Sequence, residues 1–96
     1  MSLVFEWDPR KARSNLRKRR VSFAEAVSVF SNPLARIFPD EERAAEESRE
    51  IIVGHPSAKR LLLVCFTEPG TDGVRIISAR RAMREEQHDY EEHVTT

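Results

Sequence analysis

The stretch "EIIVGHPSAKRLLLVCFTEPGTDGVRIIS", residues 50–78, decides the fold of this chain. It holds three apolar runs, at 50–54, 60–67 and 74–78, which are separated by segments that contain Pro or Gly. Apolar and β-branched runs of this length between Gly and Pro are typical of β-strands. Three sequential strands with short connections predict an antiparallel meander.

Two helices are predicted before these strands. Asp8 is a suitable N-cap and Pro9 suits the first turn, so one helix begins near Pro9, with Ala12 and Leu16 facing the core. A second helix is expected over about 22–30, because "SFAE" at its start has the spacing of a reciprocal capping box.

A third helix is expected after the strands, from about Arg80 to Glu92. Its core-facing candidates are Ala79, Met83 and Tyr90. Short strands at 4–7 and 34–38 bring the sheet to about four to five strands, and the acidic segment 40–47 is expected to be a loop.

These elements predict a single domain of the α+β class over residues 1–96. Its antiparallel β-sheet carries two N-terminal helices and one C-terminal helix. The aromatic residues Trp7, Phe5, Phe23, Phe30 and Phe66 lie inside periodic segments, so we expect them in the core rather than on a surface that stacks bases.

The composition describes a highly charged globular protein. Of the 96 residues, 33% are charged and 40% are hydrophobic. The apolar run 61–66 is far shorter than a membrane span, and Glu6 and Asp8 stand where a signal peptide would be apolar. The single Cys65 cannot form an internal disulfide and reads as a small buried hydrophobe. We expect a cytoplasmic protein with no membrane contact.

The net charge of zero conceals a segregation of charge along the chain. Residues 1–39 hold eight Lys or Arg against three Asp or Glu, and 51–81 hold five against two. The acidic residues gather in 40–50 and 82–96. If folding brings the basic segments together, they create a positive surface suited to a polyanion.

Several kinds of site have no signal in this sequence. There is no Gly-rich phosphate loop, no metal-ligand spacing and no Ser/His/Asp order. His55 is a tempting acid or base, but it precedes a Pro in an expected turn and is better explained as a surface residue. We therefore expect no metal and no cofactor.

Two separated motifs resemble those of the BrnT family of type II toxins. They are "FEWDPRKARSNLRKRRVSFAEAVSVF" and "RIISARRAMREEQHDYEE". The resemblance rests on the opening F-E-W-D, on Lys11, Asn15 and Lys18, on V-S-F-x-E-A, on R-I-I-S-A-R, and on Glu86 and Tyr90 four residues apart. It covers nearly the whole chain.

The resemblance implies a RelE-like fold and an endoribonuclease that blocks translation. It also implies a BrnA-like antitoxin as the partner, with DNA bound only through the toxin–antitoxin complex. Two departures from the family pattern bear on activity. Arg19 and Arg20 replace the family's usual His and Gly, and Glu68 and Pro69 stand where an Arg is common.

RNA cleavage without a metal uses the 2′-hydroxyl as nucleophile, and arginine suits the charge that builds on the phosphoryl oxygens. We therefore expect the N-terminal cations and the arginines after the last strand to converge on one concave surface. The catalytic candidates are Arg80, Lys11, Glu86 and Tyr90, and the RNA-binding candidates are Lys18, Arg19, Arg20 and Arg81.

Simpler interpretations of these residues stay open. Arg80 and Arg81 also suit a solvated helix start, with Arg81 facing Glu85. Strand alternation places Arg75 and Ser78 on opposite faces unless a bulge intervenes. A non-catalytic module that binds an antitoxin or RNA remains the alternative to an enzyme.

Overall fold

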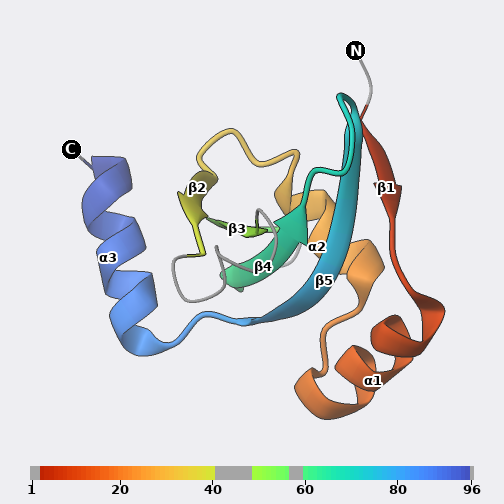
Figure 1. Ribbon diagram of the computed structural model, residues 1–96. Coiled ribbons are helices and arrows are strands. Elements are labelled where there is room, and N and C mark those ends of the chain that lie inside the picture. The colour runs from red at the N-terminus through yellow and green to blue at the C-terminus, as the bar shows by residue number, and fades with distance from the viewer. Residues whose placement is uncertain (1–2, 41–48, 57–59, 96) are drawn as a thin grey trace.

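A computed structural model of the chain describes residues 3–40, 49–56 and 60–95 (Figure 1). The elements are β1 (Val4–Glu6), α1 (Pro9–Arg19), α2 (Phe23–Val29), β2 (Arg36–Pro39), β3 (Arg49–Gly54), β4 (Leu62–Thr67), β5 (Gly73–Arg81) and α3 (Arg84–Thr95). The predicted α+β class, with two N-terminal helices, one C-terminal helix and a five-stranded sheet, is confirmed. Most of the acidic segment 40–47, expected to be a loop, lies outside the described residues.

The sheet has the order β1-β5-β4-β3-β2. The meander β3-β4-β5 is antiparallel as predicted, and β2 also pairs antiparallel with β3. The sheet as a whole is mixed, however, because β1 pairs parallel with β5, from Val4 opposite Gly73 to Glu6 opposite Arg75. Strands that follow one another directly in the sequence commonly pair antiparallel, whereas β1 is followed by two helices and no turn fixes its direction.

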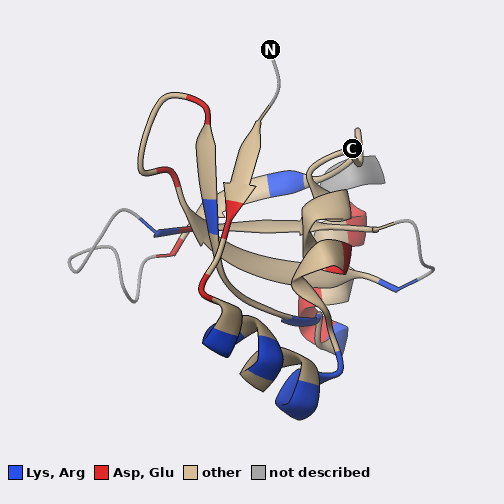
Figure 2. Ribbon diagram, turned by 90° about the vertical axis from the view of Figure 1, so that its right-hand side faces the viewer, with Lys and Arg blue, Asp and Glu red and all other residues tan. Residues whose placement is uncertain are grey.

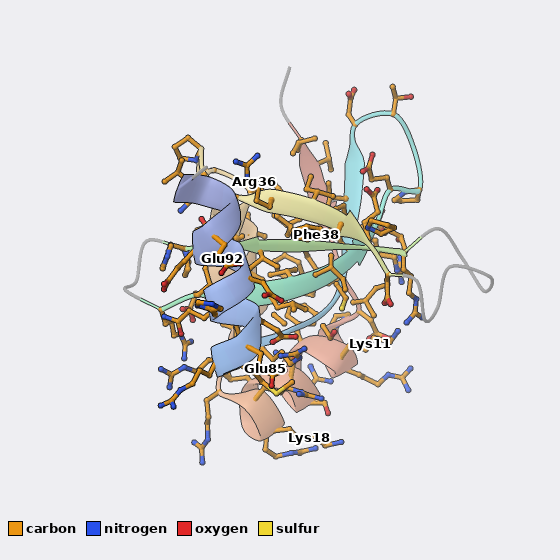
Figure 3. All side chains as sticks on the ribbon, turned by 90° about the vertical axis from the view of Figure 1, so that its left-hand side faces the viewer. Lys11, Lys18, Arg36, Phe38, Glu85 and Glu92 are labelled. Carbon is orange, nitrogen blue, oxygen red and sulfur yellow. The ribbon has the colours of Figure 1, made fainter. Side chains whose placement is uncertain are left out.

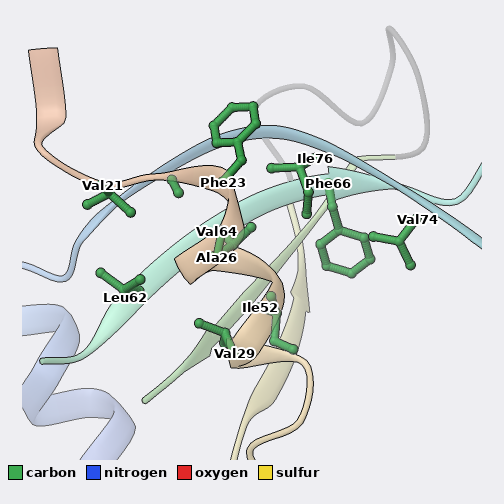
Figure 4. Packing of buried hydrophobic residues seen from close by; sticks show 11 residues of the cluster. Val21, Phe23, Ala26, Val29, Ile52, Leu62, Val64, Phe66, Val74 and Ile76 are labelled. Carbon is green, nitrogen blue, oxygen red and sulfur yellow. The ribbon is translucent and has the colours of Figure 1, made fainter. Parts of the chain in front are cut away.

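The two faces of the sheet carry separate hydrophobic clusters. On one face α2 packs its buried Phe23, Ala26 and Val29 against the strands, around the fully buried Phe66 and Leu62 (Figure 4). On the other face Tyr90 of α3 packs against a smaller cluster from β3 and β4. The helices α1 and α2 therefore cover one face and α3 covers part of the other (Figure 1).

The aromatic residues pack in the core, as expected. Phe30 makes edge-to-face contacts with Phe5 and Phe66, at 5.1 and 5.0 Å between ring centroids, and Trp7 meets Phe23 in the same way at 5.9 Å. Cys65 is only half-buried, beside the smaller cluster.

The predicted helix starts are present, with one correction. Asp8 accepts a hydrogen bond from the backbone N–H of Arg10, and Ser22 accepts one from that of Glu25. The side chain of Glu25 does not complete a reciprocal capping box, because it pairs with the guanidinium of Arg60. A charged partner binds a carboxylate more strongly than a backbone N–H does.

Three further expectations about side chains and boundaries are wrong. Leu16 and Met83, expected in the core, are 51% and 62% exposed. Helical structure does not begin at Arg80, because β5 continues to Arg81 and α3 begins only at Arg84. Pairing of Arg80 and Arg81 with Leu63 and Leu62 of β4 holds them in the sheet.

Candidate RNA-binding site

Two adjoining pockets lie along the seam between α1 and β5. The Arg80 pocket, of about 380 Å³, is lined by Lys18, Arg19, Arg80, Arg81 and Met83. The Lys11 pocket, of about 220 Å³, is lined by Lys11, Ser14, Asn15, Lys18, Arg19, Ile77 and Ser78. Because they share Lys18 and Arg19, we treat the two pockets as one feature, the basic groove.

One side of the basic groove is a single face of α1. Lys11, Ser14 and Lys18 follow one another at helical spacings of three and four residues, so they share that face. Figure 3 shows Lys11 and Lys18 on α1, well apart from Phe38 on β2. Figure 2 shows Lys and Arg residues at several positions along α1, near one end of the molecule.

Asn15 fixes α1 to the sheet beneath these cations. It is 7% exposed, and its amide donates hydrogen bonds of 2.9 Å to the carbonyl oxygens of Val21 and Ala79. Its side-chain oxygen accepts a 3.1 Å hydrogen bond from the backbone N–H of Ala79. The amide thus pairs with the edge of β5 as a neighbouring strand would, which sets the position of α1 along that edge.

The other side of the groove is the C-terminal half of β5, where the strand has a bulge. Ser78 lies opposite Cys65 but Ile76 lies opposite Phe66, so Ile77 is an extra residue. The bulge places Arg75, Ser78 and Arg80 on the same face of the sheet, which strict alternation does not allow. Arg81 lies on the opposite face from Arg80, and the Arg80 pocket is formed around the end of the strand.

Arg80 is held by Glu86, in the first turn of α3. Two hydrogen bonds of 2.8 Å join the guanidinium to the two carboxylate oxygens, and each side chain is 29% exposed. Glu86 also accepts a 2.8 Å hydrogen bond from the backbone N–H of Met83. The hydrogen bonds from Arg80, and to a lesser extent the one from Met83, hold the pKa of Glu86 below its usual range. The same pairing with Glu86 raises the pKa of Arg80. Arg80 is therefore fixed in place and always charged.

The other cations of the groove have no such partner. Within the described residues, no carboxylate lies within 4.0 Å of Lys11, Lys18, Arg19 or Arg81. The acidic helix α3 packs on the opposite face of the sheet from α1, so its described carboxylates pair with none of the α1 cations. The groove is therefore a positively charged surface open to an anion.

Two of the predicted site residues lie away from the groove, and Glu86, although it pairs with Arg80, lines neither of its pockets. Tyr90 is 4% exposed, and its hydroxyl donates a 3.0 Å hydrogen bond to the carbonyl oxygen of Leu34. It lines an apolar pocket of about 280 Å³ on the α3 face of the sheet, and burial raises its pKa. Arg20 lines neither pocket of the groove and ends α1 in the left-handed conformation, with φ 61°.

Sequence reasoning missed three polar residues of the groove. Asn15 belongs only to the family resemblance, and Ser14 is not among the residues on which that resemblance rests. Strand alternation predicts Ser78 on the opposite face from Arg75 unless a bulge intervenes, and the bulge at Ile77 is present. The spacing of Ser14 between Lys11 and Lys18 is the signal that finds it.

The described part of the chain shows neither a cluster of metal ligands nor a membrane-spanning helix. No group of three His, Cys, Asp or Glu is placed to hold a metal ion. None of the described helices has the length and apolar character that a bilayer crossing requires. His55 is exposed, with its ring edge-to-face against that of Tyr90.

Comparisons with known proteins show a family and a similar fold. Residues 7–86 match a family described as the ribonuclease toxin, BrnT, of type II toxin–antitoxin systems. The fold is similar to the crystal structure of the Brucella abortus ribonuclease toxin BrnT, with 24% sequence identity, a TM-score of 0.65 and coverage of 88% of this chain and 99% of that chain. No curated protein matches the chain.

Proposed function

The chain belongs to the BrnT family of ribonuclease toxins of type II toxin–antitoxin systems, and we propose that it is an endoribonuclease that cuts RNA in the basic groove. The observation that carries the proposal is the convergence of Lys18, Arg19, Arg80 and Arg81 on one pocket. Cleavage of RNA in this way blocks translation in the bacterial cytoplasm, and the chain acts as one domain over residues 1–96.

The proposed reaction needs no metal ion. The 2′-hydroxyl of the substrate gives its proton to water and its oxygen attacks the adjacent phosphorus. The bond to the 5′-oxygen breaks, that oxygen takes up a proton from water, and the products are a 2′,3′-cyclic phosphate and a 5′-hydroxyl end. DNA is spared because it has no 2′-hydroxyl. The protein supplies positive charge where negative charge develops on the phosphoryl oxygens.

Arg80 is the catalytic residue in this proposal. It is held at the end of a strand, where two of its five N–H groups donate to Glu86 and one to the carbonyl oxygen of Arg81. The two remaining N–H groups of the planar guanidinium suit the oxygens of a phosphate. Glu86 is a positioning residue rather than a base, because a carboxylate with a lowered pKa is a weak proton acceptor. Lys11, Lys18, Arg19 and Arg81 bind the RNA backbone. Tyr90, which lies in the apolar pocket, holds α3 on the sheet.

The family implies an antitoxin, and we propose a BrnA-like protein in that role. Covering the basic groove with acidic side chains is the simplest way for it to silence the toxin. DNA is bound only through the toxin–antitoxin complex in this proposal.

A non-catalytic binding module is the second candidate. This candidate is favoured by the ion pair between Arg80 and Glu86, which engages the guanidinium. It is also favoured by Glu68 and Pro69, which stand at a position where the family commonly has Arg. Such a module binds RNA or the antitoxin and leaves RNA intact.

The experiment that separates the two uses partner-free protein, total cellular RNA and EDTA. Wild type should degrade the RNA and slow growth when expressed, and Arg80→Ala should lower the cleavage rate by about 10²-fold or more. Arg75→Ala is the matched control, because Arg75 lies on the same strand, pairs with Glu6 and lines neither pocket. Intact RNA with wild type, or equal rates for Arg80→Ala and Arg75→Ala, would refute the enzyme proposal.

A further inference from the structure

We propose that the Lys11 pocket is a second phosphate-binding subsite, so that the basic groove holds two consecutive phosphodiesters of a single RNA strand. This rests on the proposed function, which puts the scissile phosphodiester in the Arg80 pocket. The Lys11 pocket then binds the neighbouring phosphodiester and sets which linkage is cut.

The lining of the Lys11 pocket has the chemistry of a phosphate site. It offers the ammonium groups of Lys11 and Lys18, the guanidinium of Arg19, and the hydroxyls of Ser14 and Ser78. These are the side chains that donate to phosphate oxygens in nucleic-acid complexes. Among the residues that the structure describes, no carboxylate lines the pocket, so no acidic side chain there repels an anion.

The spacing of the lysines separates two anion positions. Lys11 and Lys18 are seven residues apart on one helix face, or roughly 10 Å along the axis of α1. The Arg80 pocket contains Lys18 but not Lys11, and the Lys11 pocket contains Lys11 but neither Arg80 nor Arg81. Each pocket thus has its own cation, and Lys18 and Arg19 lie between them. This arrangement suits two successive phosphates better than one.

The cations of the Lys11 pocket are also not neutralised from within the protein. Arg60, Arg75 and Arg80 each pair with a carboxylate, whereas Lys11, Lys18 and Arg19 have none within 4.0 Å among the described residues. Unpaired like charges that share one pocket repel each other, and a bound anion relieves that repulsion.

Both walls of the pocket are fixed before any ligand arrives. Asn15 ties α1 to Ala79 of β5, and the bulge at Ile77 sets the position of Ser78. Because the backbone of both walls is already in place, binding restricts only the exposed Lys and Arg side chains, so even a short oligonucleotide should show the effect of the second phosphate.

The test measures, by NMR titration over a range of salt concentrations, the affinity of the protein for a three-nucleotide 2′-O-methyl RNA without terminal phosphates. This ligand has two phosphodiesters and cannot be cut through the 2′-oxygen. Two further versions each replace one phosphodiester by a neutral methylphosphonate. Wild type should bind the fully charged version about tenfold more tightly than either half-neutral version. Its affinity should fall with salt at a log–log slope of about −1.4, against about −0.7 for the half-neutral versions.

Two variants with the same change in charge locate the effect. Lys11→Met should abolish the advantage of the fully charged ligand, whereas Arg13→Met should keep it, because Arg13 is on the same helix but lines neither pocket. Equal affinity of wild type for the charged and half-neutral versions would overturn the proposal, and so would an equal effect of the two variants. Tighter binding of a hexaglutamate peptide than of the trinucleotide would also overturn it and assign the pocket to a protein partner.

The outcome separates this inference from the proposed function. If wild type cleaves cellular RNA yet binds all three trinucleotides alike, only the second subsite fails. If wild type binds no version even at low salt, and cellular RNA stays intact, both fail together.

Discussion

Replacing Asn15 by Ala tests whether this amide joins α1 to the sheet. The change removes three hydrogen bonds, two that the amide donates to the carbonyl oxygens of Val21 and Ala79, and one that it accepts from the N–H of Ala79. The substitution leaves the buried backbone N–H and carbonyl oxygen of Ala79 without their hydrogen bonds to Asn15.

The expected loss follows from the number of bonds. At about 1 kcal/mol for each hydrogen bond, and more where a buried group is left unsatisfied, Asn15→Ala should lower the free energy of unfolding by about 3 kcal/mol. A small domain has only about 5–15 kcal/mol in total. For a chain of this size the Tm should fall by about 12–24 °C.

Urea unfolding followed by circular dichroism measures the difference, and Asn32→Ala is the control. Asn32 also makes two side-chain hydrogen bonds of 2.8 Å, to the carbonyl oxygen of His55 and from the N–H of Leu34, but at an exposed site. Water replaces those bonds, so the control should lose less than about 1 kcal/mol. A loss of less than about 1 kcal/mol for Asn15→Ala, or a loss equal to that of Asn32→Ala, would show that the Asn15 amide does not hold α1 on the sheet.

Three further changes test other parts of the account by urea unfolding. Gly54→Ala should destabilise the protein by about 1–3 kcal/mol, because a Cβ there lies 2.9 Å from another Cβ, while Gly70→Ala, in open space, should change stability by less than about 0.5 kcal/mol; similar effects would contradict this. Arg20→Gly should stabilise by about 0.5–1 kcal/mol, because it relieves a left-handed backbone conformation, and any loss of stability counts against it. Glu86→Gln should be less stable than wild type at pH 7. The pKa of Glu86 is lowered in the folded protein from its usual 4.5, so its stabilisation is complete above that pH and is lost as the pH falls through the lower, folded-state value. The gap between the two proteins should therefore close in acid, and a gap independent of pH would exclude the pair with Arg80 as its cause.

Local signals explain which parts of the fold were predictable. The strands at 50–54, 60–67 and 74–78 were found because both faces of the sheet are covered, so the runs are almost wholly apolar. The starts of α1 and α2 were found because Asp8 and Ser22 act on residues only two or three positions away.

The features that were missed depend on distant partners. Asn15 is buried against Ala79, which is 64 residues away in the sequence, so no local signal predicts its burial. The exposure of Leu16 follows from the same orientation of α1. The parallel pairing of β1 and the bulge at Ile77 are likewise set by pairing between strands. Family resemblance supplied Lys11, Lys18 and Arg80 as site candidates, but only the fold shows that Arg80 is paired with Glu86.

The most direct test of the account is the cleavage of an oligonucleotide with a single 2′-hydroxyl. A 2′-O-methyl RNA that carries one ribonucleotide is incubated with partner-free protein in EDTA, and the products are identified by mass spectrometry. We expect one break, immediately 3′ of the ribonucleotide, with a 2′,3′-cyclic phosphate on one product, and loss of this cleavage in Arg80→Ala. Cleavage at 2′-O-methyl positions, an unchanged rate in Arg80→Ala, or an intact oligonucleotide under conditions in which wild type degrades cellular RNA would contradict it.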